Sequence, residues 1–141
     1  MTHVLIVTSP YYADISDELV KGATAYLEQY GMEYEIVNVP GAFEIPGAIR
    51  MALGADKFDG FIALGCVIRG ETSHYDYVCG ESARGLQQLA TEHAVPIGYG
   101  ILTVENKEQA WVRAAIDQKN KGRDAAEACV QMMQLKQKWN R

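Results

Sequence analysis

Residues 65–80, GCVIRGETSHYDYVCG, place several chemically active side chains in one short stretch. An apolar run ends at Ile68, and a cation, two hydroxyls and an imidazole follow within the segment 69–74. Thr72 can donate a hydroxyl hydrogen bond, and His74 can move protons near neutral pH. A helical pattern begins directly afterwards, and the first N–H groups of a helix lack partners within it. This stretch therefore has the parts of an anion site, suited to a phosphate, with a proton-transfer group beside it.

The same stretch also has a purely structural interpretation. Ser73 and Asp76 have the spacing of a capping-box variant, and Thr72 has the chemistry of a helix cap. Arg69 can pair with Glu71 or with another carboxylate. A histidine at a helix start is also compatible with a structural role, so this stretch alone does not decide between catalysis and capping.

A second segment, VPGAFEIPGAI at 39–49, combines residues that suit a small organic ligand. Gly41 and Ala42 keep the chain slim enough for a planar ligand to approach the backbone. Phe43 offers a ring for stacking, and the Glu44 carboxylate can accept hydrogen bonds from hydroxyl groups. A helix cap with a core phenylalanine explains the same residues, so this segment is ambiguous on its own.

The elements that must position these residues alternate between short apolar runs and longer helical patterns. The segment 60–68 is the most apolar and is predicted to be a central strand, whereas 33–39 alternates at first and is predicted nearer an edge. The predicted strands are 4–9, 33–39, 60–68 and 96–104, and the predicted helices are 14–30, 43–53, 75–93, 106–117 and 121–139. This order predicts an α/β fold in a single domain over residues 1–141, with a four-stranded parallel sheet between two helical layers.

Open parallel sheets bind ligands at the carboxyl ends of their strands. Both segments described above follow predicted strands, and Tyr11 and Tyr12 follow the first one, where we expect exposed aromatic rings. The sequence therefore predicts one site at this edge of the sheet, built from loops that are far apart along the chain.

Composition narrows the class of protein. The 141 residues are 48% hydrophobic and 22% charged, with a formal net charge of −5 and a pI of about 5.1. This balance argues against a nucleic-acid or anionic-membrane surface, so a bound anion must be attracted by a local site. Cys66, Cys79 and Cys129 lack metal-ligand spacing and are predicted to be reduced thiols. The sequence has no signal-peptide pattern and no apolar run long enough to span a bilayer, which predicts a soluble cytoplasmic protein.

Motifs of other nucleotide-binding and phosphate-binding folds are missing. The chain has neither GxGxxG nor the GxxxxGK[ST] phosphate loop. It lacks the acidic cluster of a receiver domain and the glycine of a flavodoxin-type phosphate loop after the first strand. No grouping of His, Cys and carboxylates has metal spacing, so no metal is expected.

Three ordered segments together resemble the 6,7-dimethyl-8-ribityllumazine synthase family. They are VPGAFEIPGAI, then ALGCVIRGETSHYDYV, then GILTVENKEQA with NKG downstream, and the resemblance runs from the first strand to the last helix. It implies a flavodoxin-like sheet and the penultimate reaction of riboflavin biosynthesis. In that reaction 5-amino-6-(D-ribitylamino)uracil and 3,4-dihydroxy-2-butanone 4-phosphate give the lumazine, phosphate and water, without a metal or organic cofactor.

The resemblance also assigns roles to individual residues. His74 aligns with the proposed general acid/base, and Arg113 with a phosphate-binding arginine lent by the neighbouring subunit. Tyr11 aligns with an aromatic residue that stacks on the ring, and Tyr99 with an aromatic residue that the neighbour supplies. The remaining matches are Glu71 and Thr72 at the phosphate, Ala42, Phe43 and Glu44 at the ribityl chain and ring, Cys66, Val67 and Ile68 with backbone contacts to the pyrimidine, and Lys121 within reach of the ligand.

Since Tyr99 and Arg113 match residues of a neighbour, the resemblance implies a closed homo-oligomeric ring, a pentamer, with sites between subunits. Some family members stack into decamers or build sixty-subunit capsids. Here the chain begins almost directly at the first predicted strand, which favours a smaller assembly. Riboflavin synthase is a candidate partner in the pathway.

One departure from the family lies after the first strand, where Pro10 and Tyr11 replace a common Arg-Phe pair. It keeps one alternative open, a catalytically weak paralogue that binds flavin or lumazine. A second alternative is a generic phosphate-binding module of flavodoxin-like fold. The intact set of Thr72, His74 and Arg113 favours the enzyme, because a pure binder would not need the phosphate-binding residues.

Overall fold

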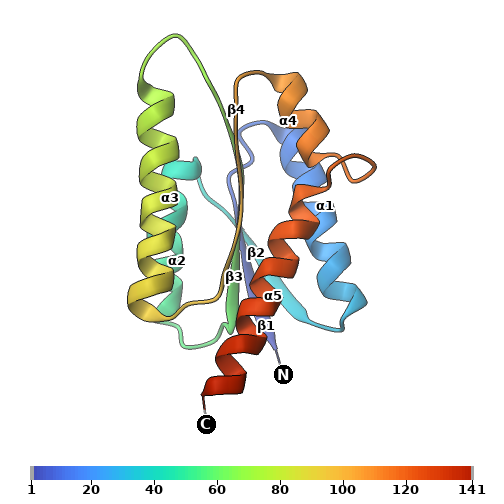
Figure 1. Cartoon of the computed structure of the whole chain (residues 1–141), viewed down its shortest axis with the longest axis vertical. Helices are drawn as coiled ribbons and strands as arrows, with labels where there is room; N and C mark the ends of the chain where they lie inside the picture. The colour runs from blue at the N-terminus through green and yellow to red at the C-terminus, as the bar shows by residue number, and fades with distance from the viewer. Residues whose placement is uncertain (1, 141) are drawn as a thin grey trace.

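The computed structural model describes residues 2–140, and Met1 and Arg141 of the predicted domain lie outside this range. Strands and helices alternate along it, as the sequence pattern predicts (Figure 1). The strands are β1 (His3–Thr8), β2 (Glu33–Asn38), β3 (Gly60–Ile68) and β4 (Ile97–Val104). The helices are α1 (Ala13–Gln29), α2 (Ile45–Leu53), α3 (His74–His93), α4 (Lys107–Ala114) and α5 (Lys121–Trp139), and a short 3₁₀ turn, η1 (Ala42–Glu44), precedes α2.

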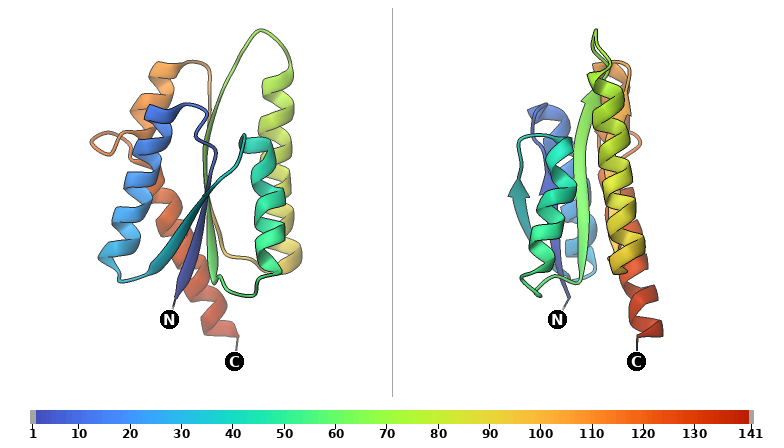
Figure 2. Two further views of the ribbon diagram at one scale, coloured as in Figure 1. Left: turned by 180° about the vertical axis from the view of Figure 1, so that it is seen from behind. Right: turned by 90° about the vertical axis from the view of Figure 1, so that its left-hand side faces the viewer.

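The strands form a four-stranded sheet in the order β2-β1-β3-β4, and every neighbouring pair is parallel. Helices α1, α4 and α5 lie on one side of it, and α2 and α3 lie on the other (Figure 2). The predicted three-layer α/β/α sandwich with a flavodoxin-like sheet is thus confirmed. So are the interior place of β3 and the edge place of β2.

Alternate residues of each inner strand supply the two cores. In β1, Val4 and Ile6 pack with α1 and α5, whereas Leu5 and Val7 pack with α2 and α3. Because helices cover both faces, β1 and β3 are almost continuously apolar. The two cores hold the inner strands rigidly, and it is these strands that carry the loops of the predicted site.

Close contact between α5 and the sheet depends on a residue without a side chain. A Cβ placed on Gly98 of β4 would lie 1.9 Å from the carbonyl oxygen of Ala125 in α5. Glycine is therefore required here for the helix to approach the strand as closely as it does.

Two predicted helices have different limits in the structure. The predicted helix at 43–53 begins with η1, and the α-helix starts only at Ile45, with Pro46 in its first turn. The predicted helix at 106–117 ends at Ala114, because Ala115 adopts an extended ψ of 132°. The next backbone N–H, that of Ile116, instead donates to the Glu18 carboxylate of α1 at 3.1 Å.

Candidate active site

A cleft of about 660 Å³ opens at the carboxyl ends of β1 and β3, between η1 and the first turns of α3. It lies at the edge of the sheet where the sequence predicts a site. Its lining comes from four separate segments, namely Ser9, Tyr11 and Tyr12; Pro40, Gly41, Ala42, Phe43 and Glu44; Cys66, Val67 and Ile68; and His74, Tyr77 and Val78.

Most of the predicted site residues come together here. Segments around positions 11, 43, 67 and 74 are distant in sequence, and the sheet brings them to one cavity. The predicted residues that line the cleft are Tyr11, Ala42, Phe43, Glu44, Cys66, Val67, Ile68 and His74. The predicted residues that do not line it are Glu71, Thr72, Tyr99, Arg113 and Lys121.

The floor of the cleft is fixed where β1 meets β3. The backbone N–H of Ser9 donates to the carbonyl of Leu64 at 3.0 Å, which extends the strand pairing by one residue. A Cβ on Gly65 would lie 2.7 Å from the Ser9 hydroxyl, so Gly65 leaves room for that side chain. Ser9 is almost completely buried, and its loop therefore starts from a rigid position.

Aromatic rings form the walls. Tyr11 and Phe43 are 76% and 54% exposed, so both rings are available to contact a ligand in the cleft that they line. Tyr12 meets Tyr11 edge to face, with ring centroids 4.9 Å apart. Tyr12 itself is half-buried, so the expectation of two exposed rings is correct for Tyr11 and wrong for Tyr12, which packs against the α1 core. The walls suit a planar ring system.

The cleft does not contain an activated thiol. Burial raises the pKa of the Cys66 thiol to about 11, so this group stays protonated at neutral pH and is a poor nucleophile. Burial likewise raises the pKa of Cys79 in α3. Cys66 therefore lines the cavity without offering an activated thiolate.

The connection from β3 to α3 lies beside the cleft and carries Glu71 and Thr72, both exposed. The Thr72 hydroxyl oxygen accepts a hydrogen bond from the backbone N–H of His74 at 3.3 Å. Ser73 makes no side-chain cap bond, so the capping-box interpretation of Ser73 with Asp76 is wrong. The first turn of α3 is held by a backbone bond from Asp76 N–H to the Ser73 carbonyl instead.

Tyr99, Arg113 and Lys121 lie elsewhere in the chain. Tyr99 is in β4, opposite Ala63 of β3 and several residues before the strand ends. Arg113 is near the end of α4, where it donates to the Gln109 carbonyl at 3.1 Å. Lys121 begins α5 and pairs with Asp124 at 3.4 Å. None of the three lines the cleft of its own chain.

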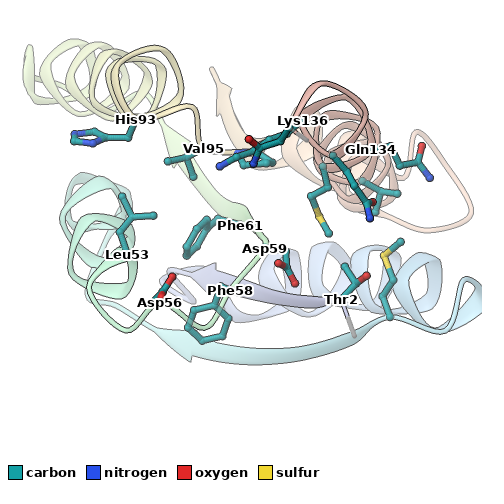
Figure 3. Close-up of a pocket in the computed structure, with 16 residues that line it drawn as sticks. Thr2, Leu53, Asp56, Phe58, Asp59, Phe61, His93, Val95, Gln134 and Lys136 are labelled. Atoms are coloured by element: carbon teal, nitrogen blue, oxygen red, sulfur yellow. The ribbon is translucent and has the colours of Figure 1, made fainter.

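A larger hollow of about 840 Å³ lies at the opposite, amino-terminal end of the sheet (Figure 3). Its walls carry side chains of mixed charge, including Asp56, Asp59, His93 and Lys136, around the ring of Phe61. None of the predicted site residues lines it. The carboxyl-end cleft is therefore the better candidate, in keeping with ligand binding by parallel sheets.

Between residues 2 and 140, no group of three or more His, Cys, Asp or Glu side chains could hold a metal ion. In the same range, no helix combines the length and apolar character that a membrane span requires.

The model of the 6,7-dimethyl-8-ribityllumazine synthase family matches residues 1–137. The chain belongs to this family. A 6,7-dimethyl-8-ribityllumazine synthase of Agrobacterium fabrum is 53% identical over 141 residues, covering 96% of this chain and 95% of the relative. One from Rhizobium meliloti, 6,7-dimethyl-8-ribityllumazine synthase 1, is 52% identical (96% and 92% covered), and one from Novosphingobium aromaticivorans is 50% identical (99% and 100% covered).

Membership of the lumazine synthase family confirms the resemblance drawn from the three sequence segments. The structure adds cleft residues that sequence reasoning did not select, among them Ser9, Pro40 and Tyr77. Tyr77 follows His74 by almost one helical turn, so both project from the start of α3, and this spacing was the available signal. Ser9 gave no such signal, since only the pairing of β1 with β3 places it on the floor.

Proposed function

We propose that the carboxyl-end cleft condenses 5-amino-6-(D-ribitylamino)uracil with 3,4-dihydroxy-2-butanone 4-phosphate. The products are 6,7-dimethyl-8-ribityllumazine, phosphate and water, in the penultimate step of riboflavin biosynthesis. The observation that carries the proposal is that Phe43, Glu44 and His74 line one cleft in a chain of the lumazine synthase family. The proposal requires no metal and no organic cofactor.

In this proposal the pyrimidine occupies the apolar part of the cleft. Its ring stacks on Tyr11, and the backbone of 66–68 reads its polar edge. The ribityl hydroxyls donate to Glu44, near Ala42 and Phe43. The support is positional: these residues line the same cavity, and Tyr11 and Phe43 offer exposed rings.

The phosphate of the second substrate is proposed to bind at the connection between β3 and α3. The N–H groups of Glu71 and Thr72, the Thr72 hydroxyl and the dipole of α3 would hold it. Supporting this is the position of the connection, at the start of a twenty-residue helix and next to a cleft residue, His74. Arg113 would complete the site with a bidentate guanidinium.

His74 is proposed as the general acid/base. One exocyclic amine of the pyrimidine attacks the ketone, and one water leaves as the imine forms. Phosphate then leaves by elimination, and the second exocyclic amine closes the ring on the resulting carbonyl with loss of a second water. Each step needs a proton moved at nitrogen, carbon or oxygen, and an imidazole can serve both as donor and acceptor. His74 lies on the wall of the cleft, within the space that both substrates would share.

We further propose that the active enzyme is a homopentamer, formed by this single domain in the cytoplasm. Tyr99, Arg113 and Lys121 lie away from the cleft of their own chain, so their assigned roles require a neighbouring copy. A heterologous interface that closes into a ring places such residues in every site. Riboflavin synthase would receive the product.

The test is a product assay with the purified protein. Mixing both substrates should give lumazine fluorescence well above the uncatalysed rate. Tight binding of the pyrimidine or of flavin without turnover would contradict the proposal and favour a binding protein. Sedimentation at the assay concentration measures the assembly independently.

A further inference from the structure

Arg69 has an environment that the proposed chemistry does not explain. It follows β3 directly, and its Nε lies 3.1 Å from both carboxylate oxygens of Glu105, the residue that follows β4. One terminal nitrogen lies 3.4 Å from Oδ1 of Asp76 in the first turn of α3. The guanidinium carbon lies 4.3 Å from the centroid of the Tyr75 ring. Arg69 thus contacts three side chains from two parts of the carboxyl-end edge: the first turn of α3 and the residue that follows β4.

The contacts of Arg69 with Tyr75 and Asp76 join the two ends of the β3–α3 connection. Arg69 is at one end of the connection, and Tyr75 and Asp76 are just beyond the other end. Between them lie Glu71 and Thr72, the proposed phosphate-binding residues. The backbone N–H of Arg69 also donates to the Val104 carbonyl at 2.9 Å, so the start of the connection is fixed to β4 as well.

Glu105 is itself held in place. Its backbone N–H donates to the side-chain oxygen of Gln109 in α4 at 2.8 Å. Two successive contacts, between Gln109 and Glu105 and between Glu105 and Arg69, therefore join the first turn of α4 to the start of the β3–α3 connection. Figure 1 shows the β3–α3 and β4–α4 connections at the same end of the sheet.

The charges argue against Arg69 as a phosphate ligand. One guanidinium and the two carboxylates of Asp76 and Glu105 carry a formal sum of −1, so this cluster does not attract an anion by itself. The guanidinium is also committed on its donor edge to the carboxylates and on its face to a ring. Its geometry suits holding the connection.

Global stability does not explain the cluster either. All three side chains are substantially exposed, at 41%, 61% and 58% for Arg69, Asp76 and Glu105. Ion pairs in such positions contribute little to folding because water and salt screen them. The physical consequence that remains for these ion pairs is a local one, namely that they restrain the β3–α3 connection.

We propose that Arg69 is a positioning residue that latches the β3–α3 connection, so that its N–H groups and His74 keep a binding-ready arrangement. The inference rests on the proposed function for its effect on turnover. The latch itself, the contacts of Arg69 with Tyr75, Asp76 and Glu105, does not depend on which substrate binds. Preorganisation of this kind matters because small displacements of reacting groups cost large factors in rate.

The test compares Arg69→Gln, Arg69→Lys and Glu105→Gln with Arg84→Gln. Arg84 is the matched control, since it pairs with Glu81 at 2.7 Å on the exposed face of α3 but touches neither connection. With both substrates, Arg69→Gln should lower kcat/KM for the butanone phosphate about ten- to a hundredfold. The affinity for the lumazine product, measured by fluorescence titration, should change much less. Arg84→Gln should stay within about twofold of the parent protein.

Two comparisons distinguish the latch from a simple charge effect. Lysine keeps the charge but lacks the planar fork and the stacking face, so Arg69→Lys should resemble Arg69→Gln. The double variant Arg69→Gln/Glu105→Gln should lose less than the product of the two single losses, because both act on one contact. Full activity in Arg69→Lys, or independent losses in the double variant, would overturn the proposal.

A readout without substrate keeps the latch separate from the proposed function. Hydrogen exchange of a peptide covering 69–77 should be faster in Arg69→Gln and Glu105→Gln than in the parent, while peptides of β1 and α5 exchange unchanged. If the parent makes no lumazine, the proposed function fails and the exchange experiment still judges the latch. Unchanged exchange at 69–77 would overturn the latch even in an active enzyme.

Discussion

The hydroxyl oxygen of Thr72 accepts a hydrogen bond from the backbone N–H of His74 at 3.3 Å, at the point where α3 begins. This contact orients the connection that precedes the helix and joins the proposed phosphate-binding residue to the proposed acid/base. His74 lines the cleft, whereas Thr72 lies beside it. In the proposed function, binding of the phosphate and transfer of protons would therefore depend on the same turn.

Replacement of His74 by alanine should impair turnover without abolishing it. A general acid/base contributes about 10²–10⁴-fold, whereas orientation of two bound reactants supplies much of the remaining acceleration. The measurement is the initial rate of lumazine formation at saturating substrates. His93→Ala is the control, since His93 is at the other end of α3 and should leave the rate unchanged. Complete loss of activity in a folded, assembled His74→Ala protein would contradict the dominance of orientation.

Replacement of Thr72 by alanine should act mainly on the phosphorylated substrate. The substitution removes the hydroxyl and with it a proposed contact to the phosphate. The KM for the butanone phosphate should therefore rise more than the KM for the pyrimidine. Thr91→Ala is the control, since Thr91 lies near the other end of α3, where its hydroxyl donates to the Gln87 carbonyl at 2.9 Å. Arg113→Ala should show the same asymmetry as Thr72→Ala. Equal increases in both KM values would argue against the phosphate assignment.

Stability should fall as the pH rises above about 9. In the unfolded chain a thiol ionises near its ordinary pKa of 9.0, but burial raises the pKa of Cys129 to about 12 and that of Cys66 to about 11. Between these values the folded state binds more protons than the unfolded state, so the free energy of unfolding decreases with increasing pH. Urea unfolding at pH 7, 9 and 10 measures this decrease. Cys129→Ala should make it shallower, and an unchanged slope would exclude Cys129 as a contributor.

The limits of β3 follow from its sequence, whereas the end of α4 does not. The segment 60–68 is apolar throughout and is followed by charged and small residues, so its limits match the observed strand. After Ala114 the sequence has no helix breaker, and the predicted helix continues to 117. The observed end depends on Glu18, 98 residues earlier, which accepts the N–H of Ile116. A contact over that separation leaves no local pattern.

The candidate site shows the same division. Loops after parallel strands are predictable, and Phe43, Glu44 and His74 could be selected because their types suit a ligand and their segments follow strands. The half-burial of Tyr12 and the floor position of Ser9 arise from packing against α1 and β3, which sequence patterns do not describe. Arg113 looks like an ordinary helix charge, and only family resemblance selects it.

Two glycine-to-alanine substitutions should change stability in opposite directions. In Gly98→Ala the new Cβ would lie 1.9 Å from the Ala125 carbonyl oxygen, so the α5 backbone must move and unfolding should become easier by about 1–3 kcal/mol or more. In Gly80→Ala nothing lies within 4 Å of the new Cβ, and an alanine inside α3 should stabilise by about 0.5–1 kcal/mol. Urea unfolding of both variants and the parent at one protein concentration tests the pair. Equal stability of Gly98→Ala and the parent would mean that α5 is not held against β4 as closely as the structure places it.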